Sequence, residues 1–496
     1  MYPSPPIHNE DLNTQNQKIM KKYLPLLGLA AALVGCKSEK TTPDSGWPAF
    51  ELADQTYVDY FTGYLKGNTG AYATSVSLTA DQVAETQAVV WDSWGSAYSR
   101  TVKEQLPPPT PMPTYDKNNF PPQSGSWELQ DANPFYTGTM PFYYFSKGSK
   151  PAAGYPLFLF LHGSGNSSLD EWHAVYSWAG YFQDSPSLYF IPRSPKGAEG
   201  TRWKLKSRQL TWEQLLCQSY LQGETDPNRI YFFGISEGAY GSQSLAAFYA
   251  DYLAGAGPLA GGENLKFAPP ENYANIAFTM HTGEKDFSYS RDQLTLAVGE
   301  ELDRLQAAHP GYYNHRVELM PGKEHGFYYN EAQTTEWLER QPARNPWPKY
   351  VYWEDFPLDE GYDGEASRRY RDGFYNLYVK ERSNDDASSR SCYEMTITGN
   401  TVDLTVNTVT YAVAEDGPYN IPLKYAKTYT PATKGRVVIY LNDKLVDLTR
   451  PVTVRVNGVE KFNGTVSLDA ANLVNSCAAF FDPERLFPAS VEVTVQ

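Results

Sequence analysis

The hydrophobic positions of the chain follow two patterns, which meet near residue 345. Between about residues 123 and 345, short continuous apolar runs alternate with longer stretches in which apolar residues recur at helical spacing. This alternation predicts βα units and a mainly parallel sheet that is covered on both faces. The predicted strands are Met140–Phe145, Leu157–His162, Leu188–Ile191, Arg229–Gly234, Ile276–His281 and Arg316–Leu319, and the predicted helices are Thr211–Leu221, Ala239–Leu253 and Gln293–Ala308.

Beyond Asn345-Pro346-Trp347-Pro348, apolar residues recur at every second position, and turn signals such as Thr398-Gly399-Asn400 separate the runs. Strands with one apolar and one polar face predict an antiparallel sandwich of roughly 150 residues. The predicted strands are Val351–Trp353, Phe374–Val379, Tyr393–Ile397, Val402–Val406, Val437–Tyr440, Val452–Val456 and Val491–Val495, with one helix around Leu468–Cys477.

The first part of the chain is less regular. Residues 81–98 predict a helix, and the proline-rich run Pro107–Pro113 predicts a stiff connector that marks a boundary. We therefore expect an upstream segment and signal peptide at residues 1–36, a tether and partly helical region with the connector at 37–122, an α/β domain at 123–345 and a β-rich domain at 346–496.

The sequence Gly234-Ile235-Ser236-Glu237-Gly238 stands between a predicted strand and a predicted helix. A strand, a sharp turn at a serine and a helix form the context that a nucleophilic serine needs in a G-x-S-x-G motif. The turn crowds the backbone, so glycine is needed on either side, and the helix N-terminus favours developing negative charge. We therefore predict that Ser236 is a nucleophile; the alternative is a turn serine that caps a helix.

A serine hydroxyl needs a general base, and in this arrangement an acid and then a histidine follow the serine along the chain. His325 lies in the loop directly after the strand Arg316–Leu319, from which it can reach the turn at Ser236. Asp286 lies in the loop after the preceding strand and would hold the imidazole in the correct tautomer. The alternatives are Glu284 for the acid and His281, His309 or His315 for the base.

The tetrahedral intermediate of acyl transfer needs backbone N–H donors for its negative charge. One donor should be the N–H of Glu237, the residue after the nucleophile. The second should come from the loop that follows the strand Leu157–His162, where glycines let the backbone turn its amides inward. In that loop we favour Ser164, with Gly163 as the alternative, and we expect the His162 side chain to brace the loop.

Together these residues resemble the α/β-hydrolase family over roughly residues 125–340. The run from Asp226 to Gly241 looks like secreted esterases of the polyhydroxybutyrate-depolymerase and feruloyl-esterase type, and also like prolyl-oligopeptidase-type catalytic domains. Family patterns often have glycine where this chain has Ala239. The resemblance makes residues 123–345 the catalytic domain and implies hydrolysis through an acyl-enzyme, with no metal and no organic cofactor. The runs Tyr440–Leu448 and Val452–Gly458 are similar to a β-domain appended to some bacterial members.

An ester substrate is favoured over a peptide because the roughly 100 residues before the α/β domain are too few for the propeller of a prolyl oligopeptidase. Aromatic residues make up 15% of the chain, with 38 Tyr, which suits binding of a small-molecule or glycan ester, such as an acylated glycan. One alternative function is that of a serine peptidase. A second alternative is an inactive scaffold that binds glycan or an envelope protein. Trp172, Trp178 and Trp203 are candidate pocket residues.

The net charge of −15 argues against nucleic-acid binding, because the phosphate backbone would be repelled. Met20-Lys21-Lys22 and the apolar run Tyr23–Leu33 predict a signal peptide, too short to span a membrane. The sequence Leu33-Val34-Gly35-Cys36 resembles the lipobox of bacterial lipoproteins. The resemblance implies a lipidated Cys36, a location in the bacterial cell envelope on the periplasmic or surface side, and membrane attachment through this lipid only.

Three cysteines, Cys217, Cys392 and Cys477, follow the predicted lipidation site. Export would permit a disulfide, and a pair between Cys392 and Cys477 is conceivable because both lie in the C-terminal region. Free, buried thiols are the alternative. No Cys-x-x-Cys spacing indicates a zinc site.

Overall fold

The computed structural model describes residues 47–114, 116, 119–129, 138–165, 167–195, 203–358, 369–384 and 388–496. Residues 45–496 form one compact unit. The predicted signal peptide and Cys36 lie outside the described residues, and the predicted domain boundaries stay predictions. None of the described helices combines the length and the hydrophobicity needed to cross a bilayer.

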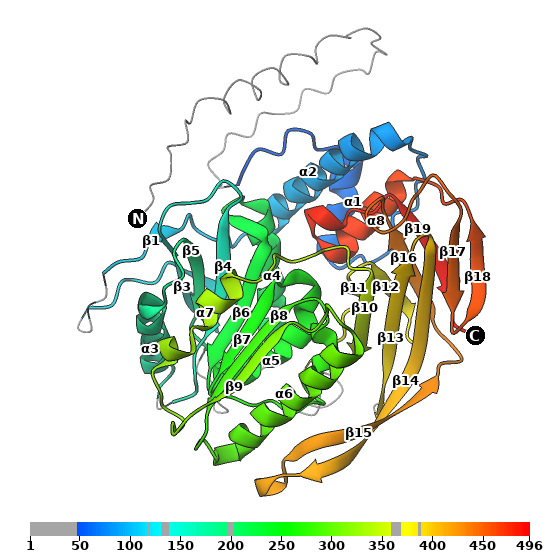
Figure 1. The fold of residues 1–496 in the computed structure, drawn as a ribbon. Helices are drawn as coiled ribbons and strands as arrows, with labels where there is room; N and C mark the ends of the chain where they lie inside the picture. Colours follow the sequence, from blue (N-terminus) through cyan, green and yellow to red (C-terminus); the bar gives the residue numbers. More distant parts are fainter. Residues whose placement is uncertain are drawn as a thin grey trace, which may run out of the picture. The chain divides into compact units, whose positions relative to one another are not determined.

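A mostly parallel sheet forms the centre of the α/β part (Figure 1). Its strands are β1 (Thr110–Pro111), β2 (Gly125–Glu128), β3 (Thr139–Lys147), β4 (Tyr155–Leu161), β5 (Ser187–Pro192), β6 (Thr225–Ile235), β7 (Gly255–Leu259), β8 (Ala277–Gly283) and β9 (His315–Met320). They lie in the order β1-β3-β5-β4-β6-β7-β8-β9, with β2 on β3. Strands β4 to β9 run parallel, and β3 is antiparallel to β2 and β5.

Helices cover both faces of this sheet, as the continuous apolar strands predict. They are α3 (Ser168–Tyr181), α4 (Lys206–Leu221), α5 (Glu237–Tyr249), α6 (Arg291–Ala308) and α7 (Thr334–Glu339). Successive residues of a strand point to opposite faces, so Leu157 and Leu159 of β4 join the apolar cluster under α4, α5 and α6, whereas Phe158 and Phe160 join the cluster under α3 and α7. Each strand therefore needs apolar residues at every position.

Strands β2 and β7 and helices α3 and α7 of the α/β part are absent from the sequence prediction. Strand β7 reads Gly-Ala-Gly-Pro-Leu and has no β-branched residue, so propensity gives no signal for it. Its glycines are required by packing, because a Cβ at Gly255 would lie 2.5 Å from the Ala277 carbonyl oxygen. The predicted connector also differs: Thr110–Pro111 pairs with β3 as an edge strand, a position that tolerates proline.

Two further sheets form the C-terminal part. One has the order β10-β13-β14-β17-β18 with β15 on β14, and the other β11-β12-β16-β19. Pairing is antiparallel except between β14 and β17. The strands are β10 (Tyr350–Asp355), β11 (Gly373–Phe374), β12 (Leu377–Glu381), β13 (Ser389–Thr398), β14 (Thr401–Asp416), β15 (Pro422–Pro431), β16 (Arg436–Leu441), β17 (Val452–Val456), β18 (Val459–Gly464) and β19 (Ala489–Thr494).

The apolar residues of both C-terminal sheets belong to the cluster that also lies under α4, α5 and α6. The prediction of a single strand Phe374–Val379 is wrong, because Tyr375 has a φ of 52° and the chain turns there between β11 and β12. Strands β15 and β18 carry mostly exposed side chains and give no clear alternation of buried and exposed positions.

The N-terminal helices α1 (Gln55–Leu65) and α2 (Val83–Thr101) pack with α8 (Ala470–Phe480) in a third apolar cluster. This cluster also contains Cys217 of α4 and Cys477 of α8, while Cys392 lies in β13. All three thiols are free and buried, so the conceivable pair between Cys392 and Cys477 does not form.

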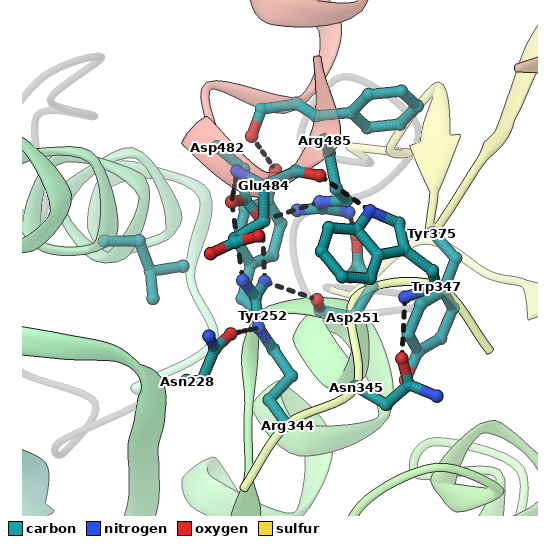
Figure 2. Close-up of polar contacts among 12 residues, drawn as sticks. Asn228, Asp251, Tyr252, Arg344, Asn345, Trp347, Tyr375, Asp482, Glu484 and Arg485 are labelled. Carbon is teal, nitrogen blue, oxygen red and sulfur yellow. Dashed lines mark hydrogen bonds and ion pairs between the residues drawn. The ribbon is translucent and has the colours of Figure 1, made fainter. Parts of the chain in front are cut away.

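A buried network of ion pairs joins the C-terminal part to the α/β part (Figure 2). Asp482 pairs with Arg344 at 2.6 Å and with Arg485 at 2.8 Å, and Arg485 also pairs with Asp251. A further arginine, Arg371, pairs with Asp251. Burial would raise the pKa of both carboxyl groups, but the charges of the arginines outweigh it and hold the pKa of Asp251 and Asp482 below the ordinary value.

Candidate active site

Ser236 stands at the turn between β6 and α5. Its φ is 57° and its ψ is −117°, a conformation that costs energy for a residue with a side chain. The flanking glycines permit the turn: a Cβ at Gly234 would lie 2.3 Å from the Gly238 carbonyl oxygen, and one at Gly238 would lie 2.1 Å from the Leu161 carbonyl oxygen. A sharp turn at a serine between a strand and a helix, on a mostly parallel α/β sheet, confirms the predicted α/β-hydrolase fold class.

The structure brings the three predicted catalytic side chains together. His325 Nε2 lies 3.1 Å from Ser236 Oγ, and His325 Nδ1 lies 2.7 Å from Asp286 Oδ2. The His325 side chain is 41% exposed and that of Asp286 only 2%, so the acid is shielded from water while the base remains accessible. His325 follows β9 and Asp286 follows β8, at the same edge of the sheet as the turn at Ser236.

A further residue, Arg291, holds the second oxygen of Asp286. Arg291 Nη1 donates to Asp286 Oδ1 over 2.8 Å, and the arginine is buried at the first turn of α6. With Oδ1 occupied, Oδ2 is left to His325. The sequence analysis did not identify Arg291; a cation five residues after the predicted acid, at the start of a predicted helix, was the signal available.

The alternative acid and bases have other partners. Glu284 is exposed and accepts from the Gly322 backbone N–H. The other three histidines are held elsewhere: His281 beside Glu318, His309 stacked on Tyr350, and His315 beside Asp303. Burial and the nearby Arg316 charge lower the pKa of His281 to about 3. Among the described residues, the side chain that is hydrogen-bonded to Ser236 Oγ is that of His325.

His162 braces the loop that contains Gly163 and Ser164. Its Nε2 accepts from the Ser194 backbone N–H over 3.0 Å, so the proton resides on Nδ1, which donates to the Gly163 carbonyl oxygen over 2.6 Å. In a trans peptide the N–H points opposite to the C=O, so the Ser164 N–H faces away from the buried imidazole. Trp203 Nε1 donates to the His162 carbonyl oxygen from the far side.

Gly163 lies directly beside Ser236. A Cβ on Gly163 would lie 3.3 Å from Ser236 Cβ and 2.9 Å from Glu171 Oε2. Glu171 stands in the first turn of α3 and was not identified from the sequence. Burial, together with the neighbouring Asp170, raises the pKa of Glu171, whereas His325 lowers it. A second carboxyl group therefore lies beside Gly163 and close to Ser236.

The three tryptophans predicted as pocket candidates divide into two groups. Trp172 and Trp203 are buried and donate their indole N–H groups to backbone carbonyls of Ile191 and His162, so they belong to the core. Trp178 is partly exposed, and its ring contacts the rings of Tyr328 and Tyr329, which follow His325 closely in the chain. Only Trp178 lies at the edge of the site.

The arrangement provides a hydroxyl, a base that can remove its proton, and an acid that orients the base. Glu237 is the first residue of α5, and the N–H of such a residue has no partner within its own helix. Within the described ranges, no group of three or more His, Cys, Asp and Glu side chains is arranged to hold a metal ion.

No family model and no curated protein matches this sequence. Among solved structures, the chain is similar to a thermostable esterase (20% identity, TM-score 0.32), an S-formylglutathione hydrolase from Agrobacterium tumefaciens (16%, 0.33) and a CE1 ferulic acid esterase from Anaeromyces mucronatus (13%, 0.33). The likeness covers 43%, 43% and 46% of this chain. It covers 58% of the thermostable esterase, 92% of the hydrolase and 93% of the ferulic acid esterase.

Proposed function

We propose that the protein is a serine hydrolase that cleaves carboxylic esters through an acyl-enzyme on Ser236. The observation that carries the proposal is the continuous hydrogen-bond relay from Ser236 Oγ through His325 to Asp286. A hydroxyl in such a relay becomes a nucleophile because the imidazole accepts its proton during attack. Neither histidine nor carboxylate needs to move for this transfer, because both hydrogen bonds are already formed.

In the first half-reaction, Ser236 Oγ attacks the ester carbonyl carbon while His325 Nε2 takes the proton. The resulting imidazolium donates through Nδ1 to Asp286, which stabilises its charge. His325 then returns the proton to the departing alkoxide, and the acyl group remains on Ser236. In the second half-reaction, water repeats the attack on the acyl-enzyme, and the carboxylic acid is released.

The tetrahedral intermediate carries a negative oxygen that needs donors. We propose the N–H groups of Glu237 and Ser164 for this role, with Gly163 as the alternative to Ser164. Support comes from the position of Gly163 against Ser236 and from the orientation that His162 imposes on the next peptide. Removal of one such donor typically costs about 3 kcal/mol of transition-state stabilisation.

The test is the Ser236→Ala variant. Hydrolysis of p-nitrophenyl acetate should fall by roughly 10³-fold or more, with the melting temperature unchanged, and labelling by a fluorophosphonate probe should be lost. Ser177→Ala is the matched control, because the Ser177 hydroxyl donates only to the His173 carbonyl oxygen in α3. Residual activity above a hundredth of wild type would place the nucleophile elsewhere, and faster cleavage of aminoacyl amides than of esters would favour a peptidase.

A further inference from the structure

A hairpin from the C-terminal part reaches the loop that carries the proposed catalytic acid. Strands β14 and β15 extend alongside α6 in Figure 1, and their connection contains the short helix η7 (Pro418–Asn420). This tip touches the short helix η4 (Ser288–Ser290), which follows Asp286. Ser290 Oγ donates to the Pro418 carbonyl oxygen over 3.2 Å. Pro418 therefore borders the proposed active site, although it lies more than a hundred positions after Ser290 in the chain.

The two tips share an unusual backbone. Tyr289 and Ser290 have φ values of 55° and 56°, and Tyr419 and Asn420 have φ values of 63° and 55°. Left-handed conformations cost energy for residues other than glycine, and they persist where the surrounding structure enforces them, often at functional sites. One tyrosine from each tip is exposed, and the two rings are tilted by 37° with their centroids 6.3 Å apart.

Exposed aromatic side chains gather around the site. Tyr289 is 63% exposed and Tyr419 is 73% exposed. Among the described residues, the exposed aromatic side chains are Tyr181, Phe287, Tyr289, Tyr328, Tyr419 and Tyr429. Phe287 and Tyr289 follow Asp286 closely in the chain, and Tyr328 follows His325. The Tyr419 ring contacts that of Tyr289, and the Tyr181 ring contacts that of Trp178, which also contacts Tyr328. Such a concentration on a surface marks a binding site.

The hairpin is anchored, so its tip has a fixed position. Lys427 of β15 is buried between Glu271 and Glu354, at 2.5 Å and 2.9 Å, and Lys424 pairs with Glu300 of α6 at 2.7 Å. Two of these acids, Glu271 and Glu300, belong to the α/β part. A buried charge that is paired on both sides does not move at low cost, and α6 begins with Arg291, which holds Asp286.

We propose that the C-terminal part completes the substrate site, because Tyr419 and Tyr289 form a stacking platform for a six-membered ring on a portion of the substrate remote from the scissile ester. This inference rests on the proposed esterase function. Arg291 lies over the Tyr289 ring at 5.1 Å, and the aromatic surface that stays exposed on the two tyrosines can bind a flat, weakly polar surface. A pyranose with its axial C–H face and an aryl ring share this chemistry, and the experiment separates them.

The test compares kcat/KM for three esters: an O-acetylated β-linked tetrasaccharide, methyl cinnamate, and ethyl acetate, which has no ring. In Tyr419→Ala, kcat/KM for a ring-bearing ester relative to ethyl acetate should fall about tenfold (~1.4 kcal/mol), chiefly through KM. Tyr419→Trp should retain the ratio, because it keeps a ring face. Tyr429→Ala is the matched control, since Tyr429 is an exposed tyrosine of the same hairpin, away from the tip.

A fall confined to the tetrasaccharide would identify a sugar as the stacked ring, and a fall confined to methyl cinnamate would identify an aryl group. An unchanged ratio for both esters in Tyr419→Ala, or an equal loss in Tyr429→Ala, would overturn the inference. The proposed function fails in a different way: hydrolysis of all three esters would then survive in Ser236→Ala, whatever the result at Tyr419.

Discussion

His162 shows how one buried side chain controls the geometry of the active-site loop. It accepts from the Ser194 N–H and donates to the Gly163 carbonyl oxygen, and both bonds require the neutral imidazole with its proton on Nδ1. Burial, with the charges of Arg208 and Arg193, lowers the pKa of His162 to about 3. The loop beside Ser236 is therefore held in one conformation across the neutral and mildly acidic range.

This pKa predicts an acid-sensitive fold. An unfolded histidine has a pKa near 6.5, so between about pH 6.5 and pH 3 the unfolded chain binds the proton that folded His162 does not. The free energy of unfolding should therefore fall as the pH falls, by about 2 kcal/mol at pH 5 from this residue alone. Denaturant unfolding of His162→Gln should show a shallower pH dependence than wild type. A His162 imidazole that titrates above pH 5 by NMR would contradict the assignment.

At the scale of elements, the junction of β6, α5 and β4 is determined by backbone contact. Helix α5 begins directly after Ser236, the proposed nucleophile, and its first turn lies against the end of β4 with no side chain between them: the position of a Cβ on Gly238 is already occupied by the Leu161 carbonyl oxygen. This close approach places the N-terminus of α5, with its free N–H groups, beside the loop that follows β4 and that we propose for the oxyanion.

Gly238→Ala should therefore separate β4 from α5. We expect a loss of activity of more than 100-fold and a lower melting temperature, because backbone cannot yield to a methyl group at 2.1 Å. Gly299→Ala in α6 is the matched control: its Cβ would make an ordinary contact of 3.4 Å with Val317. That variant should keep its activity and gain up to about 1 kcal/mol of stability. Equal activity in the two variants would contradict this account of the turn.

At the scale of the whole molecule, the α/β and C-terminal parts share a core and a buried charge network. Asp482 lies in the C-terminal part, Asp251 follows α5, and Arg344 lies in the chain between the two parts (Figure 2). Arg485 connects the two acids and lies over the Tyr252 ring at 4.1 Å. Because such a network is costly to break once buried, we expect the two parts to unfold together.

Asp482→Asn should lower the free energy of unfolding by about 3 kcal/mol, since it leaves Arg344 and Arg485 buried with one anion fewer. Calorimetry should show a single transition in wild type. The folded pKa values of Asp482 and Asp251 are lowered, so their contribution is present above about pH 4 and is lost as the pH falls further. Asp443→Asn, at an exposed pair with Lys444, should change stability by less than about 0.5 kcal/mol. Two separate transitions in wild type would contradict the shared network.

The sequence by itself determined the α/β class, the turn at Ser236 and the chain positions of Asp286 and His325. It could do so because strand periodicity, glycine at crowded turns and the order of catalytic residues are local signals. Strand β7 escaped prediction, because close packing against neighbouring backbone, and not propensity, explains its glycines.

Only the tertiary structure decided which residues surround the three predicted side chains. Glu171 and Tyr419 are brought close to them by contacts between elements that are distant in the chain, and no local pattern encodes such contacts. Arg291 lies only five residues after Asp286, but the folded chain is needed to show that its guanidinium holds the carboxylate. The sequence favoured His325 over His281, His309 and His315 because His325 follows the last strand of the sheet. The folded chain adds the contact itself, because it places the His325 imidazole 3.1 Å from Ser236 Oγ.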